Sequence, residues 1–271
     1  MRINCIPRPD EPDAIRYAYD LADTLKEDGH DVWVDYSGEK DLSREAREQP
    51  RENPDLAVVI GGDGSVLHAV RHLSPQVPLI GINFGRVGFL TDLEAQEAPD
   101  YLRRIAREGF SVEKRMRLRI SIDGTFMGDA LNEAVIVTER PSKMVMFTVV
   151  VDGIPTETFR SDGIILATPT GSTAYAMSAG GPIVDPRIRG YLLVPLAPFM
   201  LSSRPHLISA DRSLEIGFES DKPASLVLDG EPAGELENGA VVKVEESPEP
   251  AIFVNGGKSF FIKVNRKLRC L

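Results

Sequence analysis

The tetrapeptide Gly61-Gly62-Asp63-Gly64 constrains this chain most strongly, because an apolar run precedes it and a helical pattern follows it. The run from Leu56 to Ile60 is uninterrupted, which is typical of a strand covered on both faces. Glycines allow a sharp turn and a close ligand, and a helix N-terminus directs amide groups at an anion. We expect a phosphate-binding turn, although tight packing alone can also require such glycines. The helical pattern consists of Val66, Leu67, Val70 and Leu73.

Asp63 needs a separate task inside this turn, because a carboxylate among phosphate-binding amides is electrostatically unfavourable. Holding Mg²⁺ or accepting a hydroxyl proton would supply that task. Two familiar nucleotide-binding motifs are excluded. Leu67 stands where the dinucleotide fingerprint needs its third glycine, and no G-x-x-x-x-G-K sequence followed by serine or threonine exists in the chain.

Strand and helix patterns alternate over residues 1–112. Alternation of this kind indicates parallel strands with helices on the faces of the sheet. We therefore expect an α/β N-terminal domain with a Rossmann-like parallel sheet. The predicted strands cover 3–6, 32–34, 56–60 and 77–82, and the predicted helices cover 14–25, a stretch starting near Ser65, and 101–106.

Residues 113–255 carry a different pattern, with many short strand candidates and few helical repeats. Arginines alternate with apolar residues over 115–119, which we interpret as the solvated face of a strand, with phosphate steering as the alternative. The pattern predicts a mainly antiparallel β second domain, and the tail, about 256–271, is a candidate to return to the first domain. Asp-Gly pairs, which favour hairpin turns, stand at 123–124, 152–153, 162–163 and 229–230.

The charge of the chain excludes several partners. Its 41 acidic and 31 basic residues give a formal net charge of −10, which argues against a surface for nucleic acid or an anionic membrane. A phosphate-rich ligand must then be held by local amides, selected cations or a metal.

No signal-peptide pattern and no apolar stretch of membrane-spanning length is present. Cys5 and Cys270 are expected to be reduced thiols, so we expect a cytoplasmic protein.

Three polar segments of the second domain are further candidates. Thr168–Gly181 is dense in hydroxyls and glycines, and Tyr175 offers a flat face to a nucleobase. An ordinary turn with capping hydroxyls explains the same residues. Asn132-Glu133 heads one apolar strand, and Arg160-Ser161-Asp162-Gly163 precedes another. Taken alone, either segment is better explained as a solvated strand end.

In their order and spacing these segments resemble the NAD kinase family. The glycine-rich tetrapeptide alone is shared with diacylglycerol-kinase-like and phosphofructokinase-like enzymes, whereas the T-P-T-G-S-T-A-Y block is highly specific. The matching blocks are Gly61–Gly64, then Gly81-Ile82-Asn83-Phe84-Gly85-Arg86-Val87-Gly88-Phe89-Leu90, then Asn132-Glu133, and finally Asp162–Ala167 running into Thr168–Ile183.

The resemblance implies a two-domain kinase that is a homodimer or homotetramer. It implies Mg²⁺-dependent transfer of a phosphoryl group from ATP or polyphosphate to the adenosine-ribose 2′-hydroxyl of NAD, giving NADP. Asp63 matches the proton acceptor, and Gly61, Gly62 and Gly64 match the phosphate loop. The resemblance identifies no metal ligand. The implied NAD-binding residues are Asp63, Gly64, His68, Asn132, Glu133, Lys143, Arg160, Asp162, Thr173, Ala174, Tyr175, Ala176, Met177, Ser178 and Ala197. Ala197 and the Asp229-Gly230-Glu231 turn match positions whose contacts are weaker and more variable in the family.

A lipid or sugar kinase with the same loop, and a nucleotide sensor without activity, are the alternatives. The first leaves the 168–178 block without a purpose, and the second predicts the loss of Asp63 or of Asn132-Glu133, which are intact. A zinc site at His68 and His72 is disfavoured, because Ala69 stands where a metalloprotease needs glutamate. ATP and polyphosphate stay open as donors, and NAD and NADH stay open as acceptors.

Overall fold

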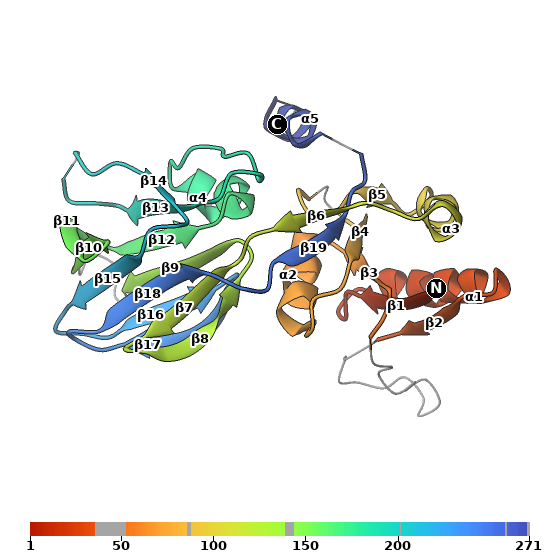
Figure 1. The fold of residues 1–271 in the computed structure, drawn as a ribbon, viewed down its shortest axis with the longest axis horizontal. Helices are drawn as coiled ribbons and strands as arrows, with labels where there is room; N and C mark the ends of the chain where they lie inside the picture. Colours follow the sequence, from red (N-terminus) through yellow and green to blue (C-terminus); the bar gives the residue numbers. More distant parts are fainter. Residues whose placement is uncertain (36–52, 86–87, 139–143, 201, 258, 270–271) are drawn as a thin grey trace. The chain divides into compact units, whose positions relative to one another are not determined.

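The computed structural model describes residues 1–35, 53–85, 88–138, 144–200, 202–257 and 259–269. The chain divides into two compact units. One is formed by Met1–Lys114 together with Ala251–Leu271, and the other by Arg115–Pro250. Figure 1 labels the helices and strands of each unit.

The first unit contains a seven-stranded sheet with the order β2-β1-β3-β4-β19-β6, and β5 pairs with β4. The pairs β1–β2, β1–β3, β3–β4, β4–β5 and β4–β19 are parallel, which confirms the expected α/β domain. The strands are β1 (Arg2–Pro7), β2 (Asp31–Val34), β3 (Leu56–Gly61), β4 (Leu79–Asn83), β5 (Leu93–Glu94), β6 (Val112–Arg115) and β19 (Ala251–Val254). The helices are α1 (Pro12–Glu27), α2 (Asp63–His72), α3 (Ala98–Glu108) and α5 (Phe260–Arg269).

The hydrophobic pattern of the first unit decides which elements lie at its centre. Every residue of β3 is buried, as its uninterrupted apolar run predicts. Parallel strands end at the same edge of a sheet, and the pairing of Gly61 with Asn83 places the ends of β3 and β4 side by side. The glycine-rich loop therefore leaves the sheet at its carboxyl edge. Helix α1 packs one face on the sheet through Ala14, Ile15, Ala18, Leu21, Ala22 and Leu25.

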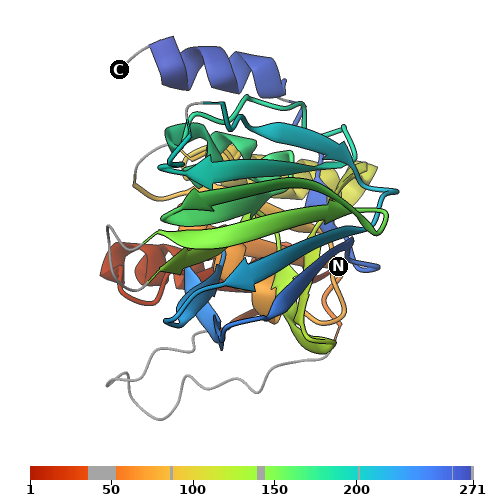
Figure 2. The same cartoon turned by 90° about the vertical axis from the view of Figure 1, so that its left-hand side faces the viewer.

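The second unit consists of two six-stranded antiparallel sheets with the orders β11-β10-β15-β18-β7-β8 and β14-β13-β12-β9-β16-β17. One continuous core contains Phe147 and Phe218 of the first sheet and Ile164 and Leu193 of the second, so the sheets pack face to face. Figure 2 shows the strands of this unit. They confirm the expected antiparallel β domain. Their bounds are β7 (Leu118–Ile122), β8 (Thr125–Ala130), β9 (Glu133–Thr138), β10 (Val145–Val151), β11 (Ile154–Ser161), β12 (Gly163–Ala167), β13 (Gly190–Leu196), β14 (His206–Ser209), β15 (Leu214–Glu219), β16 (Ala224–Leu228), β17 (Glu231–Leu236) and β18 (Val241–Glu246).

The sheet that contains β12 is covered on both faces. Ile164 enters the sandwich core, whereas Ile165 and Ala167 pack against Ala176 in a second cluster. Ala176 belongs to the hydroxyl-rich segment, which folds into the 3₁₀-helix η1 (Thr170–Thr173) and the short helix α4 (Tyr175–Ser178). Burial on both faces explains the continuous apolar run in β12, and it anchors the hydroxyl-rich segment on this sheet.

Asp162-Gly163 is not a hairpin turn, contrary to the expectation. Strand β11 ends at Ser161 in one sheet and β12 begins at Gly163 in the other, so the pair links the two sheets. A Cβ on Gly163 would lie 2.6 Å from the carbonyl oxygen of Ile136, so close strand packing requires glycine here. The other Asp-Gly pairs have positive φ at both residues, as a type I′ turn requires, at 123–124, 152–153 and 229–230.

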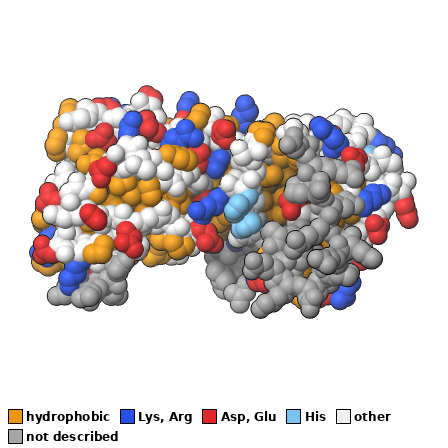
Figure 3. All heavy atoms as spheres, turned by 90° about the horizontal axis from the view of Figure 1, so that it is seen from below, with side chains coloured by type: hydrophobic (Ala, Val, Ile, Leu, Met, Phe, Trp, Pro, Cys, Tyr) orange, Lys and Arg blue, Asp and Glu red, His pale blue; other side chains and the backbone are white. Residues whose placement is uncertain are grey.

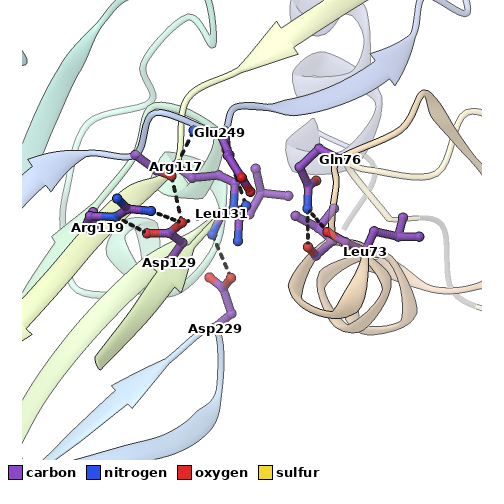
Figure 4. A network of polar contacts seen from close by, with 10 residues as sticks. Leu73, Gln76, Arg117, Arg119, Asp129, Leu131, Asp229 and Glu249 are labelled. Carbon is purple, nitrogen blue, oxygen red and sulfur yellow. Dashed lines mark hydrogen bonds and ion pairs between the residues drawn. The ribbon is translucent and has the colours of Figure 1, made fainter. Parts of the chain in front are cut away.

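The interpretation of residues 115–119 as a solvated strand face is wrong for Arg117. Its side chain is 6% exposed and lies 4.0 Å from the Asp129 carboxylate, which also pairs with Arg119 at 3.0 Å. Arg117 donates a hydrogen bond to the carbonyl of Glu249, and burial lowers its pKa. Figure 4 shows both arginines converging on Asp129 of β8, so Asp129 pairs with Arg119 of β7 and with Arg117 just before that strand.

Neither cysteine takes part in a disulfide among the described residues. Cys5 is a buried free thiol, and burial raises its pKa to about 12. Cys270 lies outside the described residues. None of the helices in the described ranges is both long and apolar enough to cross a membrane.

Candidate active site

The glycines of the 61–64 loop have two different functions. A Cβ on Gly61 would lie 2.2 Å from the Ser65 hydroxyl oxygen, so packing requires this glycine. A Cβ on Gly62 or Gly64 would meet nothing within 4 Å, so these two glycines leave open space in front of the backbone. Helix α2 begins at Asp63, and the first amides of a helix have no partner within it. The loop can therefore offer amides and a partial positive charge to a phosphate group.

Asp63 is held in place by the chain that follows β4. Its two carboxylate oxygens accept hydrogen bonds from the amides of Phe89 at 2.6 Å and Leu90 at 2.8 Å. A carboxylate has about four lone-pair positions, so each oxygen can still accept a second hydrogen bond. Sequence reasoning did not single out these two amides as partners of Asp63. Gly88, which stands beside them, was the available signal.

His68 lies on the exposed side of α2, and its ring stacks on that of His72 with 4.2 Å between the centroids. Together with Ile6, Pro7 and other residues, both histidines line a pocket of about 270 Å³. No group of three metal-ligating side chains occurs in the part of the chain that the structure describes. On the face shown in Figure 3, acidic and basic side chains are interspersed, so no charge of a single sign covers this face.

In the second unit, Asp229 organises the start of β9. Its carboxylate accepts hydrogen bonds from the amides of Leu131 and Asn132 at 2.7 Å and from that of Glu133 at 3.0 Å. Figure 4 shows the carboxylate directed at the backbone of Leu131. Burial raises the pKa of Asp229, and the three amides oppose that rise. The Asp229-Gly230 turn therefore fixes the backbone that carries Asn132 and Glu133.

Glu133 is a buried acid whose hydrogen bonds are incomplete. Its side chain is 8% exposed, and its Oε2 atom has no hydrogen-bond partner among the described residues. Burial, reinforced by the charge of Asp229, raises the pKa of Glu133 to about 7, and a hydrogen bond from the Tyr175 amide opposes the rise. An unpaired buried oxygen is costly, so a ligand that supplies a donor would be stabilised here.

The hydroxyl-rich segment uses much of its hydrogen-bonding capacity inside the protein. Thr168 donates to the carbonyl of Leu131 at 2.6 Å and accepts from the amide of Gly171 at 3.0 Å. The Ser172 hydroxyl accepts from the Val184 amide at 3.0 Å, and the Thr173 hydroxyl contacts the carbonyl of Thr170 within the same turn. These bonds satisfy the hydroxyls within the protein, but neither Ser172 nor Thr173 caps a helix, because the N-cap residues of η1 and α4 are Pro169 and Ala174.

The same segment leaves other groups for a ligand. The Tyr175 side chain is 46% exposed, and Ser178 is exposed beside it in α4. The buried Thr170 hydroxyl has no partner among the described residues. A Cβ on Gly171 would lie 2.1 Å from the Asn132 carbonyl oxygen, so the segment is in direct contact with the start of β9. The remaining residues of the expected set, Ala174, Ala176 and Met177, lie in or next to α4.

The expected site residues of the second unit form two groups at opposite ends of β12. Glu133 pairs with Ala167 at one end, whereas Gly163 pairs with Leu196 at the other. Asp162 and Ala197 flank this second pair, so the five residues of β12, or roughly 20 Å of extended chain, separate Asp162 from Thr168. Arg160 lies at the Asp162 end, where its carbonyl accepts a hydrogen bond from the Phe199 amide at 2.8 Å. Lys143 lies outside the described residues.

Comparison with known proteins covers both units. Residues 5–110 match the N-terminal domain of ATP-NAD kinases, and residues 131–256 match the C-terminal domain. Together with the glycine-rich loop on an α/β unit, these matches define a nucleotide kinase. The chain belongs to the NAD kinase family, which removes the lipid-kinase and sugar-kinase alternatives.

Individual relatives agree with this assignment. The chain is 54% identical to the NAD kinase of Methanoculleus marisnigri over 271 residues, with 100% of both chains covered. The structure resembles that of an NAD kinase from Archaeoglobus fulgidus in complex with ATP, with a TM-score of 0.81, 31% identity and 100% of both chains covered. It also shares the fold of yeast NADH kinase complexed with NADH, with a TM-score of 0.87, 23% identity, and coverage of 100% of this chain and 88% of the yeast chain.

Proposed function

We propose that this enzyme transfers a phosphoryl group from ATP or polyphosphate to the adenosine-ribose 2′-hydroxyl of NAD, giving NADP, with Mg²⁺. The main support is the position of the Asp63 carboxylate. Asp63 is the first residue of α2, its carboxylate is held by the amides of Phe89 and Leu90, and the neighbouring Gly62 and Gly64 leave open space. The relatives support the substrates, because one was solved with ATP and another with NADH.

Asp63 acts as the proton acceptor in this proposal. Its free lone pairs accept a hydrogen bond from the 2′-hydroxyl, whose oxygen attacks the terminal phosphorus of the donor. The bond between phosphorus and the leaving phosphate oxygen breaks, a bond to the 2′-oxygen forms, and the hydroxyl proton passes to Asp63. Phosphoryl transfer of this kind depends mainly on in-line positioning and on charge neutralisation. The amide bonds from Phe89 and Leu90 supply the positioning of the carboxylate.

The donor phosphates fit the N-terminus of α2. The helix has ten residues, and its first amides and dipole favour an anion. Mg²⁺ commonly binds through one or two carboxylates together with substrate phosphates. No all-protein metal cage exists among the described residues, so Asp63 and the donor phosphates would hold the ion. When bound, the ion would neutralise phosphate charge.

The dinucleotide fits the cluster around β9. Glu133 Oε2 and the Thr170 hydroxyl lack partners among the described residues, and an adenosine supplies hydroxyl and amino groups that can pair with both. Tyr175 supplies an exposed ring for stacking. We assign Asn132, Glu133 and the 173–178 segment to this half of the site.

A second copy of the chain completes the site in this proposal. Arg160, Asp162 and Ala197 lie at the other end of β12 from Glu133, so a homo-oligomer allows both groups to contact one dinucleotide. Exposed apolar side chains stand at the same end, with Phe199 68% and Met200 58% exposed. Such residues are typical of surfaces that another chain covers.

Measuring NADP formation by the purified protein with NAD, Mg²⁺ and ATP tests the proposal. Polyphosphate and NADH in parallel assays identify the donor and the acceptor. We expect turnover that depends on Asp63. A folded protein that binds NAD but makes no NADP with any donor would instead be a nucleotide sensor. We expect the enzyme to work in the cytoplasm, which localisation of a tagged chain would test.

A further inference from the structure

Helix α5, close to the chain's C-terminus, brings two lysines to the segment that holds Asp63. Lys263 and Lys267 are four residues apart and therefore lie on one face of the helix. Lys263 donates a hydrogen bond to the carbonyl of Phe89 at 3.3 Å and forms an ion pair with Asp92. Lys267 places its ammonium 4.0 Å from the centre of the Phe89 ring. Both lysines thus contact the residue whose amide binds the Asp63 carboxylate.

The two lysines differ in how their charges are satisfied. Lys263 has a carboxylate and a carbonyl as partners. The ammonium nitrogen of Lys267 is buried, with no hydrogen-bond partner among the described residues. Burial lowers the pKa of Lys267, and the negative charges of Asp63 and Asp92 partly oppose this fall. A lysine ammonium has three hydrogen-bond donors. Its attraction to the face of an aromatic ring compensates for only part of the hydrogen bonding that water would provide.

A purely structural role does not account for this arrangement. A buried ammonium without an acceptor destabilises the folded protein, and a methionine of similar length would fill the same space beside Phe89. The loss of stability caused by the buried Lys267 ammonium is explained if an anion binds to this ammonium while the enzyme works. The contact geometry links the two groups through Phe89, whose ring lies 4.0 Å from the Lys267 ammonium and whose amide binds the Asp63 carboxylate, and the charge of Asp63 acts on Lys267.

We propose that Lys267 binds the phosphoryl group during its transfer, through the buried ammonium that faces Phe89. The assignment rests on the proposed kinase activity of the same site. In the free protein the ammonium lies over the Phe89 ring and has no hydrogen-bond partner among the described residues, and a phosphate oxygen of the donor supplies the missing acceptor. The loop amides and Lys267 then contact the same polyanion from two segments far apart in the sequence.

Binding of inorganic tripolyphosphate, measured by calorimetry without NAD, tests this assignment. Lys267→Met should weaken tripolyphosphate binding about tenfold or more, because a charge-assisted hydrogen bond is lost. The affinity for NAD should be unchanged. Lys267→Arg, which retains the charge, should recover part of the tripolyphosphate affinity.

Arg266→Met is the matched control, because it removes one positive charge from an exposed position on the same helix. It should leave tripolyphosphate binding unchanged. The ligand-free melting temperature separates the roles further. Lys267→Met should melt at the same or a higher temperature than the parent protein, because a buried unpaired charge is removed.

Unchanged tripolyphosphate affinity in Lys267→Met overturns the assignment, as does an equal loss in Arg266→Met. A lower melting temperature in Lys267→Met together with unchanged binding shows that the residue is only structural. These results are independent of the proposed reaction. If the parent protein binds tripolyphosphate through Lys267 but makes no NADP, the proposed function fails and the phosphate site stands.

Discussion

Asp63 and Gly88 lie so close together that a Cβ on Gly88 would be 1.8 Å from the Asp63 Oδ1 atom. The amides of Phe89 and Leu90 approach the same carboxylate. Only glycine at position 88 lets the backbone come this near to an acidic side chain. The segment after β4 therefore holds the proposed proton acceptor in a single position.

Gly88→Ala should impair catalysis while leaving Asp63 itself intact. The new methyl group must displace the carboxylate or the backbone, and misplacement by about 1 Å can lower turnover about 100-fold. Steady-state kinetics should show the loss mainly in kcat, since the residues around Glu133 are unaffected. Gly124→Ala is the control, because this glycine lies in an exposed hairpin turn with nothing within 4 Å of its Cβ position. Equal kcat for Gly88→Ala and the parent would contradict the close contact.

Asp63→Asn should lower turnover by about 10²- to 10⁴-fold, because general base catalysis is lost. An asparagine has one acceptor oxygen, so one of the two amides at 89–90 also loses its partner. We expect a fall of about 1–3 kcal/mol in the free energy of unfolding. Calorimetry should show that NAD still binds. Asp100→Asn, an exposed acid in α3, should change neither quantity, and normal turnover in Asp63→Asn would remove Asp63 from the chemistry.

Glu133 should make stability depend on pH. Its pKa rises from 4.5 to about 7 on folding, so between these values the folded state retains a proton that the unfolded chain has released. The contribution of Glu133 to stability therefore falls as the pH rises from 4.5 and levels off above about 7.

Glu133→Gln removes this dependence. The unfolding free energy of the variant relative to the parent should increase by up to about 3 kcal/mol between pH 4.5 and pH 8, as urea titrations would show. Glu235→Gln, at an exposed position in β17, should show no such trend. A pH-independent difference for Glu133→Gln would mean that the carboxyl group is ionised in the folded protein.

Two inactive variants should restore activity when they share an oligomer. If one dinucleotide contacts Glu133 of one copy and Asp162 of another, a mixed dimer of Glu133→Gln and Asp162→Asn contains one intact site. The isolated mixed dimer should then show up to about one half of the parent activity, because one of its two sites is intact. Co-expression with two affinity tags and NADP assays on the doubly purified species would measure it. Activity no higher than that of the separate variants would place the whole site in one copy.

The hydrophobic pattern was sufficient to predict much of the fold. The uninterrupted run at 56–60 became the fully buried β3, and the helical spacing over 14–25 became α1 (Pro12–Glu27). Short polar strands such as β8 and β17 were not predicted, because partial burial gives little contrast between their two faces. The Asp162-Gly163 turn was wrongly predicted, because local turn propensity does not reveal that Gly163 must pack against Ile136.

For the site, the sequence by itself determined the chemistry that is available: a carboxylate within a glycine-rich strand-to-helix turn, and a hydroxyl-rich block after an apolar strand. Those features are local, and residue type and spacing are enough to read them. Only the tertiary structure decided which groups meet. Residues 26 to 178 positions apart are joined by the hydrogen bonds from the amides of Phe89 and Leu90 to Asp63, by those from the amides at the start of β9 to Asp229, and by the approach of Lys267 to Phe89. Such contacts arise from the packing of distant elements around a shared core, and no local pattern in the chain records them.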